Sequence, residues 1–262
     1  MREAKQKRRR HATILADGAC CIYCGGEASA DTVEHMPPII MFDQRQRPKG
    51  LEFPTCKACN HGTRLSDQVA SLLARTYPES NTEANRAEFK KLLIAASNNA
   101  PGLLEEMHVG RGGQKIAKSE IPNMPSGTGV LRANGPILRG HMEVFGAKLG
   151  LALHFELHGS PVPPAGGVLP LYFTNVNAAR GELPIEVIEL LPEKRTLAQG
   201  AKHVQNQFEY SYVTTTEAKH SVFYAVFRQS FAILACTALD RSIFLTQHGT
   251  RYRVFTPGDF KN

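Results

Sequence analysis

Four of the six cysteines form two pairs with the spacing of metal ligands, Cys21-x-x-Cys24 and Cys56-x-x-Cys59. Each pair lets a tight turn present two thiolates to one ion, and two such turns complete the tetrahedral four-sulfur site of structural zinc. Zinc binding stabilises a small domain by on the order of 10–16 kcal/mol, so one ion could organise a segment with little core. We therefore predict that all four cysteines bind one structural Zn²⁺, rather than being four unconnected buried thiols.

The 31 residues between the two pairs hold a carboxylate and a histidine that could act on a phosphodiester. Hydrolysis of that bond needs a base for water and a hard cation at the phosphate oxygens. An imidazole titrates near neutral pH, which makes His35 the candidate base. On a strand, the neighbouring Glu34 would point to the opposite face and, with the amide oxygen of Asn60, could hold Mg²⁺ or Mn²⁺. The alternatives are a surface ion pair of Glu34 with His35 and a helix-capping role for Asn60.

Three segments in order, "CIYCGG", "TVEHMPPI" and "CKACNHGTRLSD", resemble the zinc-bearing members of the HNH, or ββα-metal, endonuclease family. The resemblance covers residues 17–76 and implies a zinc-stapled β-β-α module that cleaves DNA. It also implies that Glu34 and Asn60 ligate a catalytic divalent cation and that His35 is the general base. His61 is a further candidate for the last polar position of the motif.

The sequence departs from the family pattern at two places. Family members often carry a central asparagine that fixes the loop holding the base, whereas residues 36–55 contain no asparagine. Gln44, Gln46 or a backbone carbonyl would have to replace it. The second departure is Glu34 itself, which stands where aspartate is commoner and lengthens the ligand arm by one methylene. Both changes bear on the rate and on the choice of metal.

The formal net charge of +7 is concentrated in two stretches, residues 1–10 and residues 45–64. Local positive charge on a nearly neutral body favours a polyanionic partner, here double-stranded DNA, over a basic tail that only improves solubility. Arg64, one helical turn beyond Asn60, could reach the scissile phosphate. The predicted nucleic-acid contacts are Arg8, Arg9, Arg10, Arg45, Arg47, Lys49, Lys57 and Arg64.

Hydropathy patterns around this module predict an α+β protein with a mostly antiparallel sheet in its C-terminal part. Helical periodicity is expected over residues 60–77, 82–97 and 137–158. Strand patterns are expected over residues 168–176, 185–191, 208–216, 222–227 and 231–238, although the run 221–239 alone fits a strand or a helix. Composition divides the chain into a basic N-terminal arm (1–16), the HNH module (17–77), a helical segment with a loop-rich linker (78–136) and an α+β domain (137–262).

The remaining sequence patterns bear on membrane association, on location in the cell and on further metal sites. No apolar run reaches the ~20 residues of a membrane helix, and no apolar segment follows the charged N-terminus. We therefore expect no membrane contact and a cytoplasmic, reducing location. Cys20 and Cys236 stand outside the paired spacing, and His154 and His158 are expected to be ordinary helix residues rather than a metal site.

Three functions follow from these observations. The first is a metal-dependent HNH endonuclease acting on DNA. The second is a zinc-knuckle protein that binds nucleic acid without cleaving it. The third is a nuclease controlled by its C-terminal domain, which would sense a ligand or a protein partner, as in a defence or mobile-element protein.

Overall fold

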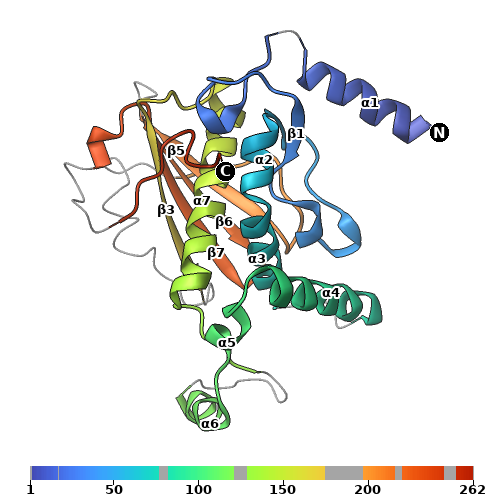
Figure 1. Ribbon diagram of the computed structural model, residues 1–262, viewed down its shortest axis with the longest axis vertical. Coiled ribbons are helices and arrows are strands. Elements are labelled where there is room, and N and C mark those ends of the chain that lie inside the picture. The colour runs from blue at the N-terminus through green and yellow to red at the C-terminus, as the bar shows by residue number, and fades with distance from the viewer. Residues whose placement is uncertain are drawn as a thin grey trace.

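A five-stranded antiparallel sheet packed against one long helix makes up much of the molecule (Figure 1). The structure, a computed structural model, describes residues 2–16, 18–76, 82–120, 129–174, 197–215, 220–244 and 252–261. The strand order is β3-β7-β6-β5-β4. The strands are β3 (Gly167–Thr174), β4 (Ala198–Gln199), β5 (Glu209–Thr214), β6 (His220–Phe227) and β7 (Phe231–Ala238). The expected α+β class with a C-terminal antiparallel sheet is confirmed.

The long helix α7 (Pro136–His158) lies directly on the sheet because two of its glycines, Gly146 and Gly150, face the strands. A Cβ added at Gly150 would come within 2.7 Å of the Ala235 side chain on β7. One added at Gly146 would come within 3.0 Å of Pro170 on β3. The central part of α7 is buried on all sides, as expected of a helix that is apolar around its circumference. The predicted helix over residues 137–158 is confirmed.

A short hairpin followed by a helix occupies the N-terminal part of the chain. Strand β1 (Thr32–His35) pairs antiparallel with β2 (Glu52–Thr55), so that Thr32 lies opposite Thr55 and His35 lies opposite Glu52. Helix α2 (Lys57–Gly62) begins two residues after β2. The loop between the strands contains the 3₁₀ turns η2 (Ile39–Met41) and η3 (Asp43–Arg45). The order of elements is therefore β-β-α, as expected.

The predicted helix over residues 60–77 is instead two helices, α2 and α3 (Arg64–Ala74). The chain turns at Thr63, whose hydroxyl donates to the Cys59 carbonyl at 3.1 Å. Helix α2 also starts earlier than predicted, because the carboxylate of Asp31 accepts from the Lys57 amide at 2.8 Å and caps it. Cys56 is the N-cap residue of α2 but makes no side-chain capping hydrogen bond, so its thiol is available to bind a metal.

Four further helices complete the described chain. Helix α4 (Glu83–Asn99) has Thr82 as its N-cap, which agrees with the helix predicted over residues 82–97. The basic N-terminal arm is a helix, α1 (Arg2–Ile14), that extends away from the body (Figure 1). The prediction of a loop-rich linker within residues 78–136 was wrong in part, because this segment contains α5 (Leu103–Met107) and α6 (Arg111–Glu120). Helix α5 forms because Leu103 and Met107, one turn apart, are both buried.

One hydrophobic core joins the N-terminal module to the sheet. Phe53 on β2, Phe145 on α7 and Phe231 on β7 belong to the same buried cluster as the cysteines. Four of the predicted strands correspond to β3, β5, β6 and β7, and the run 221–239 is therefore strand. The strand predicted over 185–191 lies outside the described residues. Among the described helices, each is too short or too polar to cross a lipid bilayer.

Candidate metal centre and its surroundings

The sulfur atoms of Cys21, Cys24, Cys56 and Cys59 all lie within 4.8 Å of one another, and all four residues are buried. A tetrahedral Zn²⁺ with Zn–S bonds of about 2.3 Å requires sulfurs about 3.8 Å apart, so the cluster fits zinc. The first pair lies on η1 (Ile22–Cys24), which ends at a left-handed Gly25 with φ of 65°. The second pair lies at the start of α2. The predicted convergence of the four cysteines is confirmed, and it fastens η1 to the β-β-α segment.

Burial and mutual hydrogen bonds shift the pKa values of these thiols in opposite directions. A hydrogen bond from Cys59 lowers the pKa of Cys21 to about 5. Burial raises the pKa of Cys24 to about 11, and the bond to Cys21 raises that of Cys59. A divalent cation would supply the positive charge that four adjacent thiolates require. Burial also raises the pKa of Cys236, on β7, to about 12, which agrees with the expectation of a core thiol.

Glu34 lies in a buried ion-pair cluster with two residues that the sequence analysis did not single out. The Lys148 ammonium of α7 donates to Glu34 at 3.1 Å and to Asp67 of α3 at 2.5 Å. Lys148 is completely buried, and the side chains of Glu34 and Asp67 are only 9% and 13% exposed. The one sign of Lys148 in the sequence is that it is a single charged residue within the apolar run 144–153.

Burial and charge act in opposite directions on the pKa values of this cluster. Burial alone would lower the pKa of Lys148, but the Asp67 and Glu34 carboxylates outweigh it and raise that pKa. Burial raises the pKa of both Glu34 and Asp67, and Lys148 opposes that rise. The Tyr23 ring lies 5.6 Å from the Lys148 nitrogen and closes the cluster on another side. Glu34, expected to ligate a catalytic cation, therefore shares the Lys148 ammonium with Asp67 in this structure.

His35 projects from the other face of β1, as strand alternation requires. Its Nδ1 atom lies 3.6 Å from a carboxylate oxygen of Glu52, directly across the hairpin. Two arginines bind the same carboxylate, Arg10 of α1 and Arg47 of the hairpin loop, each at 2.5 Å. The ring of His11 on α1 lies 5.9 Å from that of His35. The candidate base thus lies in a mixed cluster of histidines, arginines and one glutamate, with its side chain 23% exposed.

Asn60 lies at the far end of the hairpin from His35. Its amide nitrogen donates to the Thr32 hydroxyl at 3.2 Å, which leaves the amide oxygen as the end that could face a cation. Thr32 and His35 are three residues apart on β1, which corresponds to about 10 Å along a strand. Thr32 and Glu34 share a face, so Asn60 lies on the Glu34 side of the hairpin. His61, the further candidate, is exposed on α2.

Most of the predicted nucleic-acid contacts lie on the surface. Two of them, Arg10 and Arg47, bind Glu52, as described above. Arg45 and Lys57 are each 69% exposed and pair loosely with Glu88 and Asp31, at 3.9 Å and 3.7 Å. The other exposed members are Arg8, Arg9, Lys49 and Arg64.

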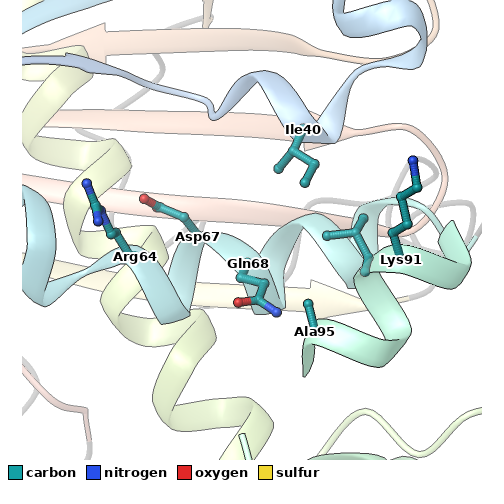
Figure 2. A pocket seen from close by; sticks show the side chains of 7 residues that line it. Ile40, Arg64, Asp67, Gln68, Lys91 and Ala95 are labelled. Atoms are coloured by element: carbon teal, nitrogen blue, oxygen red, sulfur yellow. The ribbon is translucent and has the colours of Figure 1, made fainter. Parts of the chain in front are cut away.

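A hollow of about 380 Å³ opens between η2, α3 and α4. Figure 2 shows Arg64 and Asp67 one turn apart on α3, with Ile40 above the hollow and Lys91 of α4 across it. Asp67 therefore borders this hollow and also binds Lys148.

Two buried arginines hold the hairpin loop against the body. Arg75, the C-cap of α3, donates to the carbonyls of Ile40 and Phe42 at 2.7 and 2.6 Å. Arg228, in the β6–β7 turn, donates to Asp43 at 2.9 Å and to the Met41 carbonyl at 3.2 Å. The sheet therefore fixes the loop that follows the Glu34-His35 pair.

His154 and His158 bind the sheet rather than forming a metal site among the described residues. His154 bonds with the Thr237 hydroxyl at 2.9 Å and His158 with the Ser221 hydroxyl at 2.8 Å. Burial lowers the pKa of His154 to about 4, so its ring is neutral at neutral pH. The expectation that these are ordinary helix residues agrees with these contacts.

No protein-family model, curated protein or solved structure matches the chain. The likeness to HNH endonucleases therefore rests on the cysteine, Glu-His and Cys-Asn motifs of residues 17–76.

Proposed function

We propose that residues 17–76 form a metal-dependent HNH endonuclease module that hydrolyses phosphodiester bonds in DNA, with double-stranded DNA as the favoured substrate. The observation that carries this proposal is the four-cysteine cluster beside the β1–β2–α2 segment. One bound Zn²⁺ would hold the hairpin that bears His35 in a fixed relation to the helix that bears Asn60. A reducing, cytoplasmic location would keep these thiols available for the metal.

His35 is the general base in this proposal. Its imidazole is partly exposed beside the carboxylate of Glu52, an arrangement that suits proton transfer from water. The exposed basic residues would hold the phosphates of the DNA backbone on either side, which would make binding strongly dependent on salt. Mg²⁺ or Mn²⁺, when bound, would neutralise charge on the scissile phosphate.

The candidate ligands for that cation fit only in part. Glu34 and Asn60 offer oxygen donors on the same side of the hairpin, and hard divalent cations prefer such donors. Lys148 already pairs with Glu34, so a cation at this carboxylate would compete with the ammonium. The same ion pair favours a second candidate function, a zinc-knuckle protein that binds nucleic acid without cleaving it. The same ion pair also bears on the third function, a nuclease controlled by its C-terminal domain. Lys148 lies on α7, which packs on the C-terminal sheet, and it binds Glu34 of the N-terminal module.

Plasmid nicking separates the first two functions. The full zinc-loaded chain is incubated with supercoiled plasmid and Mg²⁺ or Mn²⁺, as wild type, His35→Ala and His203→Ala, an exposed histidine on another segment. The nuclease proposal expects nicking by wild type and by His203→Ala, and loss of at least about 10²-fold in His35→Ala. Salt-sensitive DNA binding with no cleavage under either metal would instead support the non-catalytic function.

A further inference from the structure

The hairpin register places one carboxylate directly opposite the candidate base. His35 and Glu52 are Cα partners in the antiparallel β1–β2 pair. Side chains that are directly opposite project from the same face with Cβ atoms about 5 Å apart. The Nδ1 atom of His35 is consequently 3.6 Å from a Glu52 oxygen. This face is the one turned away from Lys148.

Glu52 is itself held firmly in place. Arg10 and Arg47 each lie 2.5 Å from its carboxylate, one from α1 and one from the hairpin loop. The Glu52 side chain is only 9% exposed. Two arginines restrict the rotation of the carboxylate, so its position relative to the imidazole is fixed from both sides.

A general base of this kind needs a partner at Nδ1. A neutral imidazole carries its proton on one nitrogen, and a carboxylate beside Nδ1 keeps the proton there and leaves Nε2 free to accept a proton from water. The asparagine that commonly fixes the base in HNH proteins is missing from residues 36–55. The two glutamines considered as replacements, Gln44 and Gln46, bond to each other at 3.2 Å.

We propose that Glu52 is the positioning residue of His35, and that it takes the place of the missing asparagine by keeping the imidazole proton on Nδ1. The proposal rests on the nuclease function proposed above. The distance of 3.6 Å is longer than a hydrogen bond, and at this separation the carboxylate favours the proton on Nδ1 through its negative charge.

Nuclear magnetic resonance of the ring nitrogens tests this without any activity. In ¹⁵N-labelled, zinc-loaded full chain at mildly alkaline pH, long-range ¹⁵N–¹H spectra distinguish a protonated ring nitrogen from a bare one. The His35 signals are assigned by their loss in His35→Gln. Wild type should carry the proton on Nδ1, and Glu52→Gln should shift it toward Nε2. Arg10→Gln, which loosens Glu52 but keeps its carboxylate, should retain the wild-type tautomer. The proton on Nε2 in wild type would overturn the proposal even if Glu52→Gln does not fold.

Kinetics then separate this inference from the proposed function. Glu52→Gln should lower kcat by on the order of 10²-fold or more with KM within about threefold, because orientation acts in the transition state. The matched control is Glu156→Gln, which removes another partly buried carboxylate paired with a lysine, Lys202, and should leave kcat unchanged. If His35→Ala abolishes cleavage and Glu52→Gln does not, the positioning role is refuted and the nuclease stands. If the tautomers are as expected and wild type cuts nothing, the nuclease is refuted and the orientation of His35 stands.

Discussion

Replacing Lys148 with methionine gives the sharpest test of the buried cluster. Methionine has a similar length but no charge, so the carboxylates of Glu34 and Asp67 would lose the ammonium that lies 3.1 Å and 2.5 Å from them. Removing one partner of a buried ion pair costs about 3–5 kcal/mol, because the other charge is left uncompensated. We expect the free energy of unfolding to fall by that amount. At roughly 2–4 °C per kcal/mol for a chain of this size, the Tm would fall by about 6–20 °C.

Urea unfolding of the zinc-loaded chain, followed by circular dichroism, measures this loss. The matched control is Lys202→Met, which removes a lysine paired with Glu156 where both side chains are more than 20% exposed. Partly exposed pairs contribute about 1 kcal/mol or less, so the control should be nearly neutral. The double variant Lys148→Met with Asp67→Asn should recover part of the stability, because one uncompensated charge is gone. A loss in Lys148→Met no larger than in Lys202→Met would refute the reasoning.

Three further outcomes follow from the contacts described. Cys59→Ser should reduce bound zinc well below one ion per chain by elemental analysis and destabilise the fold by several kcal/mol, whereas Cys20→Ser should keep the zinc. Because burial lowers the pKa of His154 from 6.5 to about 4, its contribution to stability is complete above pH 6.5 and is lost as the pH falls toward 4. Wild type should therefore lose about 2 kcal/mol more than His154→Asn between pH 7 and pH 5 in urea unfolding. Arg228→Met should cost about 1–3 kcal/mol, because Asp43 and the Met41 carbonyl lose this partner while Asp43 keeps Arg75 at 3.3 Å. It should also speed amide hydrogen exchange in residues 39–45, and unchanged exchange would contradict the role of this arginine.

The local patterns of the sequence were sufficient for helices α4 and α7 and for the cysteine cluster, but not for α5 and α6. The helix over residues 137–158 is recognisable because its ends carry a proline and a glycine and its length favours one element. The cysteine cluster is recognisable because each pair needs only a tight turn to present both sulfurs. Patterns failed where a single contact decides the structure, as at Thr63, where a hydroxyl bonded to a carbonyl divides the expected helix into two.

The amino-acid sequence by itself therefore determined the α+β class and the four cysteines that could hold a metal such as zinc. Tertiary structure alone decided the environment of Glu34 and His35. Lys148 is 114 positions from Glu34, and only the packing of α7 against the β1–β2 hairpin and α3 brings the two together. The partnership of His35 with Glu52 depends on the pairing register of two short strands, and a slip of one residue would turn Glu52 to the other face. Spacing along a chain fixes contacts within a turn, whereas contacts between distant elements depend on how those elements pack.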